Sequence, residues 1–395
     1  MPLSTRLLCA LFTALLAPVT HAAGASSARD LALNEVVDVM LSRPTAARAE
    51  APFSASGWLA GLPSLDASYL QSEERLGTDE TEIGLNLPIK SPFLYWQDKR
   101  LRELDSALHS AAVERRRLYF SGLLREAVWT ARIAGDHAQQ AGKMIALLEQ
   151  LQRREQDLFE ARGSSRYALL LIEQELADAR IVQEDQQAEA QRWLARYRSL
   201  TGLGSLPVDI DEPAAPAGEA WQTHPALQLL ELEREQRQAL VAAGSSRGTP
   251  WNLRIGAKRV ESPEFDETQY GVAVELPLGF TGTDRQSSSS EWQSLEREFT
   301  RNRDELSQEL ARSWQNLQIQ AQHLQRRQQL LDAAASISGQ LYSEAEALSQ
   351  LNELGSEIRI KRLIGELERQ AEASTNQLLI GQNRAMSRQA AGIPL

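Results

Sequence analysis

The sequence predicts a mainly α-helical protein with a small β part, built as a tandem repeat of one strand hairpin and one long helical hairpin. Three observations predict this fold class. Aromatic residues make up 6% of the chain and charged residues 24%, and long tracts of Ala, Leu, Glu, Gln and Arg are typical of packed helices. Short segments of alternating polarity precede these tracts. The same landmarks occur twice at a nearly constant spacing, which indicates a duplication.

The duplication is seen in three landmarks, two prolines in the strand segments and one glycine after the helical tract. Pro63 recurs as Pro250, 187 residues later, Pro88 as Pro277, 189 residues later, and Gly163 as Gly355, 192 residues later. Because the offset hardly drifts, each half of the chain is expected to repeat the same elements in the same order.

The N-terminus has the pattern of a secretory signal peptide. Arg6 precedes an apolar run from Leu7 to Val19, and small residues follow around Ala22 and Ala25. Such a run is too short to cross about 30 Å of hydrocarbon as a retained helix, although a membrane anchor is the alternative. Cys9, the only cysteine, lies inside this run. Export without cysteine fits a bacterial periplasm or outer membrane.

The net charge and the hydropathy of the chain restrict the classes of partner and the way in which it can cross a membrane. The net charge of −11 makes nucleic acid an unexpected partner, because phosphate binding needs concentrated Lys and Arg. After the signal segment no stretch reaches about 18 apolar residues, so any later membrane crossing is expected to use strands.

Each copy opens with two segments in which apolar and polar residues alternate. In the first copy they run from Leu65 to Tyr69 and from Ile83 to Leu87, and in the second from Trp251 to Ala257 and from Tyr270 to Leu276. A period of two residues predicts strands with one apolar face.

A very long helical segment follows each strand hairpin. Apolar residues recur at spacings of three and four from about Phe93 to Glu160 and again from about Arg285 to Leu348. About 67 residues at roughly 1.5 Å each give a rod about 100 Å long. Breaks at 163–165 and 352–355 then predict a turn and a return helix in each copy.

Four strands cannot close into a barrel, because closure around side chains needs about eight. An open sheet would expose two edges and an apolar face to water. Three chains of four strands each would make a barrel of about 12 strands, an even number suited to an outer membrane. We therefore expect a homotrimer; a soluble sheet packed on the helices is the alternative.

In such a barrel the two faces of the sheet have different surroundings. The residues expected to face a watery lumen are Glu82, Asn86, Arg254, Lys258 and Glu275. Those expected to face outer-membrane lipid are Tyr69, Leu85, Trp251, Leu253, Tyr270 and Val272.

Several motifs in order resemble the outer-membrane efflux protein (TolC-like) family. They are "LALNEVVDVMLSRP" near the N-terminus, "LPSLDASY", "LNLP" and "VELP" in the strands, "HPAL" at the start of the second half and "ARGSSRYALLLIEQELADAR" at the first helical turn. The resemblance implies a trimeric barrel of 12 strands in the outer membrane of a Gram-negative bacterium. It also implies a long periplasmic α-helical barrel with a belt at mid-height.

The expected segments follow from the repeat and the resemblance together. In chain order they are a signal peptide (1–25), an N-terminal periplasmic helix (26–60), the first barrel hairpin (61–90), the first long helical hairpin (91–200), an equatorial linker (201–222), a helix (223–248), the second barrel hairpin (249–280), the second long helical hairpin (281–390) and a C-terminal tail (391–395).

The resemblance also implies that the two helical turns are periplasmic tips, where an adaptor docks and the duct closes at rest. The matching positions are Gly163, Ser164, Arg166, Gly355, Ser356 and Glu357. The alternative for both glycines is helix termination through a left-handed conformation.

The resemblance implies an outer-membrane exit duct of a tripartite efflux pump, which passes substrates from an inner-membrane pump and a periplasmic adaptor to the exterior. Alternatives are the outer-membrane component of type I protein secretion and a periplasmic coiled-coil structural or adaptor protein. No catalytic motif, cofactor motif or metal-ligand spacing occurs in the sequence. We therefore expect no enzyme activity, no cofactor and no metal.

Overall fold

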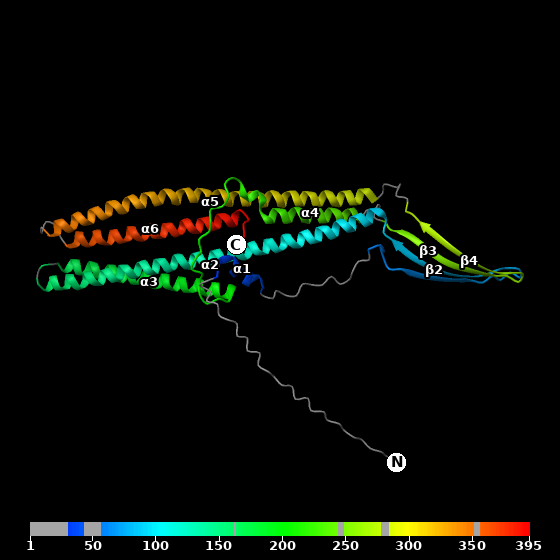
Figure 1. Cartoon of the computed structure of the whole chain (residues 1–395), viewed down its shortest axis with the longest axis horizontal. Helices are drawn as coiled ribbons and strands as arrows, with labels where there is room; N and C mark the ends of the chain where they lie inside the picture. Colours follow the sequence, from blue (N-terminus) through cyan, green and yellow to red (C-terminus); the bar gives the residue numbers. More distant parts are fainter. Residues whose placement is uncertain are drawn as a thin grey trace, which may run out of the picture.

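The computed structural model describes residues 31–42, 57–161, 163, 165–243, 249–277, 284–350 and 356–395. The expected signal peptide lies outside these residues. The molecule is elongated, with the strands at one end and the helices running away from them along the long axis (Figure 1). The predicted fold class, mainly helical with a small β part in a tandem repeat, is confirmed.

Six α-helices and one short 3-10 helix, η2 (Ala220–Thr223), make up the described helical part. The two long ones are α2 (Pro92–Glu160) and α5 (Asp284–Gln350), and their return helices are α3 (Arg166–Thr201) and α6 (Ser356–Ala390). Two shorter helices, α1 (Leu33–Ser42) and α4 (Pro225–Ala243), accompany them. None of these helices contains a window long and apolar enough to cross a membrane.

Local signals explain where the first helical hairpin begins and ends. Ser91 caps α2 by accepting a hydrogen bond from the Leu94 amide at 3.3 Å, and Pro92 is its first residue, where the missing N–H costs nothing. Ser165 caps α3 through the Ala168 amide at 3.2 Å. The helix α3 ends at Thr201 and is capped by Gly202, whose φ of 75° is left-handed.

The four strands are β1 (Ser64–Leu70), β2 (Asp79–Ile89), β3 (Trp251–Glu261) and β4 (Asp266–Glu275). They form one antiparallel sheet in the order β1-β2-β3-β4. The central pair β2–β3 joins the two halves of the chain, so the duplicated hairpins share one sheet. Within the described residues the outer edges of β1 and β4 pair with no further strand.

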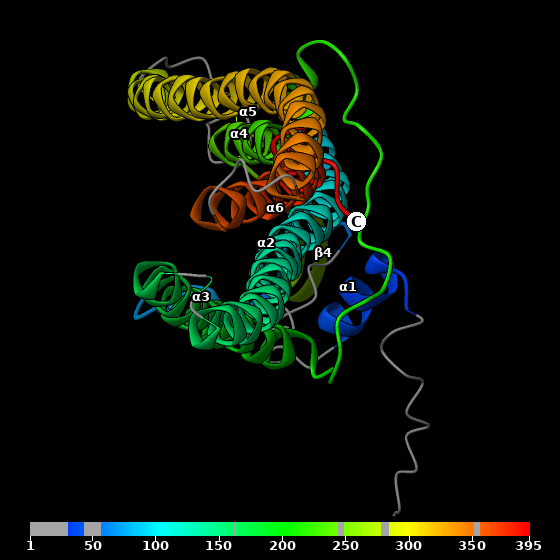
Figure 2. The same cartoon turned by 90° about the vertical axis from the view of Figure 1, so that its left-hand side faces the viewer.

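The helical hairpins pack against each other through α2 and α6 (Figure 2). Near the tips the core consists of Leu148, Leu151, Ile172, Leu176, Ile360 and Ile364. At mid-height a second core is formed by α1, the segment 202–219 and the helices α2, α3 and α6. There Val36 and Val37 of α1 are fully buried with Leu124 and Trp129 of α2.

The expected N-terminal helix 26–60 is wrong at its end. The helix α1 ends at Ser42, and residues 57–60 are not helical. Their backbone instead bonds to the end of β2: the Ala60 amide donates to the Pro88 carbonyl at 2.8 Å, and the Lys90 amide to the Trp58 carbonyl at 2.9 Å. Strand hydrogen bonds therefore replace helical ones before β1.

Candidate membrane-facing sheet and helical tips

The strand register separates polar and apolar side chains onto opposite faces of the sheet. Residues opposite each other in neighbouring strands point to the same face. Glu82 lies opposite Lys258, and Asn86 opposite Arg254, whereas Leu85 lies opposite Ile255 and Ile255 opposite Val272. All five residues expected to face a lumen lie on the polar face, and all six expected to face lipid lie on the other.

The apolar face is uncovered in the single chain. Tyr270 is 84% exposed, Val272 71% and Tyr69 61%. The apolar rows run from Trp251 to Ala257 along β3, about 20 Å at roughly 3.3 Å per residue. A continuous apolar surface of this kind marks a site that another molecule or a membrane covers.

Charged residues bound the apolar rows at the end of the sheet farthest from the helices. On the same face, Asp79 lies opposite Glu261, which lies opposite Asp266. Arg259 precedes this row and pairs with Glu261 at 2.6 Å. The apolar face is therefore a band with a polar margin at the hairpin turns.

The polar face is crossed by ion pairs between strands. The Arg254 guanidinium lies 2.6 Å from an Asp66 carboxylate oxygen on β1 and 2.8 Å from a Glu82 oxygen on β2. Lys258 pairs with Glu80 at 2.6 Å. Sequence reasoning missed Asp66 and Glu80, although both have the alternation phase of the polar face.

A glycine makes room for the Arg254 cluster. A Cβ placed on Gly84 would lie 2.7 Å from an Asp66 carboxylate oxygen and 2.9 Å from the Arg254 Nε. The missing side chain lets the two charged groups meet across β2, so Gly84 serves the ion pair rather than a turn.

The first tip lies between α2 and α3. The Gly163 amide donates to the Leu158 carbonyl at 2.7 Å, and Arg166 is exposed as the first residue of α3. Gly163 is not among the glycines with positive φ. The left-handed conformation expected at Gly163 is therefore not found at that residue, and Ser165 caps the following helix α3.

The remaining tip positions are only partly described. Ser164 and Gly355 lie outside the described residues. Ser356 begins α6, and the side chains of Ser356 and Glu357 are outside the described part of the chain.

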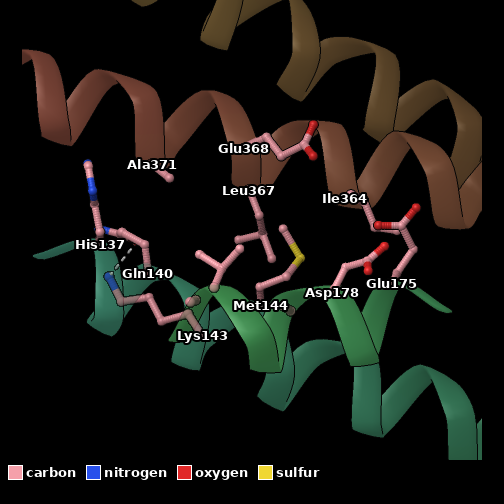
Figure 3. Close-up of a pocket in the computed structure, with 13 residues that line it drawn as sticks. His137, Gln140, Lys143, Met144, Glu175, Asp178, Ile364, Leu367, Glu368 and Ala371 are labelled. Atoms are coloured by element: carbon pink, nitrogen blue, oxygen red, sulfur yellow. Dashed lines mark hydrogen bonds between the residues drawn. The ribbon is translucent and has the colours of Figure 1, made fainter. Parts of the chain in front are cut away.

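A cavity of about 330 Å³ lies between α2, α3 and α6 (Figure 3). Leu367 of α6 points toward Met144 of α2, so the floor is apolar. Glu175, Asp178 and Glu368 stand at its border. In the part of the chain that the structure describes, no group of three or more His, Cys, Asp or Glu side chains is arranged to hold a metal ion.

Comparison with solved structures identifies the architecture. The chain superimposes on CusC with a TM-score of 0.62 at 16% identity, covering 84% of this chain and 83% of that one. The MtrE outer membrane channel of Neisseria gonorrhoeae gives a TM-score of 0.61 at 14% identity, covering 91% and 89%. The chain has the TolC-like channel fold.

The CmeC outer membrane channel of Campylobacter jejuni gives a TM-score of 0.59 at 12% identity, with coverage of 84% and 78%. No protein-family model matches the sequence, and no curated protein matches it. The TolC-like fold is thus evident in three dimensions at an identity too low for sequence matching.

Proposed function

We propose that this chain is the outer-membrane exit duct of a tripartite efflux pump. Three copies place their sheets side by side in the outer membrane of a Gram-negative bacterium, and their helices extend into the periplasm. Substrates pass through the shared lumen from an inner-membrane pump to the exterior. No step of this transport requires a catalytic residue.

One observation carries the proposal: within the described residues, a four-stranded sheet with two unpaired edges and an uncovered apolar face lies at the end of long helices. A strand edge without a partner is a template for another strand. A cyclic trimer pairs β4 of one copy with β1 of the next and leaves no edge. The apolar band then meets lipid, and the face with Arg254, Glu82 and Lys258 lines water.

The periplasmic adaptor is proposed to dock at the tips and on the surface between the two helical hairpins. Gly163 and Arg166 are exposed at the first tip. The apolar floor at Met144 and Leu367, with carboxylates at its border, suits a helix that carries both apolar and basic residues. A structural coiled coil would need neither this sheet nor its two-faced pattern.

The assembly is tested by the mass of the exported chain in detergent, measured by light scattering. A mass of about three chains supports the proposal, and a monomer that stays in solution without detergent contradicts it. Transport is tested by deleting the gene and measuring sensitivity to toxic compounds. Resistance that is restored by the wild type, but not by a Gly163→Pro, Arg166→Glu variant that still forms trimers, supports adaptor docking at the tip.

A further inference from the structure

The first turns of α2 carry an exposed aromatic pair directly beyond the apolar face of the sheet. The sheet's last apolar row places Ile89 opposite Trp251, and α2 begins three residues after Ile89. Tyr95 is 44% exposed and Trp96 61% exposed, and their rings meet edge to face at 6.1 Å. Large aromatic side chains in water at this position call for a covering partner.

An ion pair sets which way this helix turns its side chains. Lys90, which follows β2, pairs with Asp98 of α2. Trp96 precedes Asp98 by two residues, a rotation of about 200° on an α-helix. The indole ring therefore points away from the side that Lys90 and Asp98 hold.

A cation accompanies the exposed indole. The Lys99 ammonium lies 5.4 Å from the centre of the Trp96 ring, a cation–π contact between residues three apart on one helical face. Lys99 is itself exposed. Trp above an apolar band and Lys beyond it form the order in which membrane proteins meet the hydrocarbon boundary and the lipid phosphates.

The positions of Trp96 and Lys99 along the axis of α2 agree with this order. Trp96 lies about 6 Å and Lys99 about 10 Å beyond the start of α2, at roughly 1.5 Å per residue. The polar layer on each side of a bilayer is about 5–8 Å thick, the difference between about 40–45 Å overall and about 30 Å of hydrocarbon. Counted from the start of α2, the indole falls within the thickness of the headgroup layer, and Lys99 lies just beyond it with its ammonium near the Trp96 ring.

We infer that Trp96 and Lys99 anchor the duct to the periplasmic leaflet of the outer membrane, with the indole among the headgroups and the ammonium on lipid phosphate. This inference rests on the proposed function, because the sheet must lie in the bilayer for α2 to emerge from it. It extends the lipid contact from the strands onto the helical part of the chain.

Depth-dependent fluorescence quenching tests the anchor. The full chain is reconstituted into phospholipid vesicles that carry a spin label either at the headgroup or near the bilayer centre. The emission of Trp96 is taken as the difference between the wild type and Trp96→Phe. We expect the headgroup label to quench this component at least about twofold more strongly than the central label.

The emission of Trp251 is obtained in the same way, as the difference between the wild type and Trp251→Phe. It distinguishes a failure of the anchor from a failure of the proposed function. If Trp251 is quenched by lipid and Trp96 by neither label, the sheet is in the bilayer but protein covers Trp96, and the anchor is overturned. If neither tryptophan is quenched, the chain does not insert, and the proposed function fails with it.

The lysine is tested separately. Lys99→Gln is expected to reduce the headgroup quenching of Trp96 in vesicles containing anionic phospholipid, because the contact with phosphate is lost. The control is Lys143→Gln, another exposed lysine of α2 far along the helix, which should leave the quenching unchanged. Equal quenching in Lys99→Gln and the wild type would remove Lys99 from the anchor.

Discussion

Arg125 of α2 and Glu212 of the segment between the two halves form a buried, two-pronged ion pair. The Arg125 Nε and Nη2 lie 2.8 and 2.6 Å from the two carboxylate oxygens, and the side chains are 0% and 5% exposed. Glu212 also accepts from the Arg388 Nε of α6 at 3.0 Å. One carboxylate thus ties the connecting segment to a helix from each half.

Glu212→Gln is expected to destabilise the protein by about 3–5 kcal/mol, because it leaves a buried guanidinium without its counter-charge. Chemical unfolding followed by circular dichroism measures the loss. The matched control is Glu149→Gln, which breaks an exposed pair with Arg180 and should cost about 1 kcal/mol or less. Equal losses in the two variants would contradict the role given to the buried pair.

Gly381 of α6 lies against the buried Trp129 of α2. A Cβ on Gly381 would come within 2.2 Å of the Trp129 ring, so Gly381→Ala is expected to cost about 1–3 kcal/mol through overpacking. On the same helix a Cβ on Gly365 meets nothing within 4 Å. Gly365→Ala should therefore stabilise the helix by about 0.5–1 kcal/mol. If Gly381→Ala and Gly365→Ala shifted the melting temperature in the same direction, the contact between Gly381 and Trp129 would be refuted.

Neighbouring residues of β4 test the two faces of the sheet. Val272 belongs to the apolar face and Ala273 to the polar face. Val272→Lys is expected to cost about 2–4 kcal/mol in the membrane-inserted protein, whereas Ala273→Lys places its charge toward water and should be nearly neutral. The yield of assembled protein in outer-membrane fractions and its unfolding in lipid vesicles measure both. If Ala273→Lys proved the more damaging change, the assignment of the faces would be reversed.

His224, at the start of α4, makes stability depend on pH. Burial lowers the pKa of its imidazole, and the nearby charge of Arg115 adds to this effect. Its Nδ1 also accepts the Ala226 amide at 3.1 Å, which requires that nitrogen to be unprotonated. Because the folded state prefers the neutral ring, the stabilisation is present above the ordinary pKa of about 6.5 and is lost as pH falls below it.

The difference between the free energies of unfolding at pH 7.5 and pH 5 measures this effect. His224→Gln should show a smaller loss of stability between the two pH values than the wild type. His109→Gln, at an exposed position of α2, should behave as the wild type does. An unchanged pH dependence in His224→Gln would exclude His224 as its source.

Elements defined by local periodicity were predictable from the sequence. The alternation of apolar and polar residues from Trp251 to Ala257 indicates the two faces of a strand, and the spacing of apolar residues after Phe93 indicates one face of a helix. Both patterns lie within one segment, and the duplication repeats them. The residues expected to face a lumen and those expected to face lipid could therefore be assigned to opposite faces of the sheet, since the alternation of a strand does not depend on its partner.

Only the tertiary structure decided which segments meet. Alternation does not state the register across a loop, so the pairing of Arg254 with Asp66 was beyond reach. The bond from Arg125 to Glu212 joins residues 87 positions apart, and the ring of Trp129 lies over Gly381 in the other half of the chain. At Gly163 the type of residue suggested a left-handed conformation that is not found at that residue. Local order follows from neighbouring residues, whereas these contacts depend on how distant segments pack.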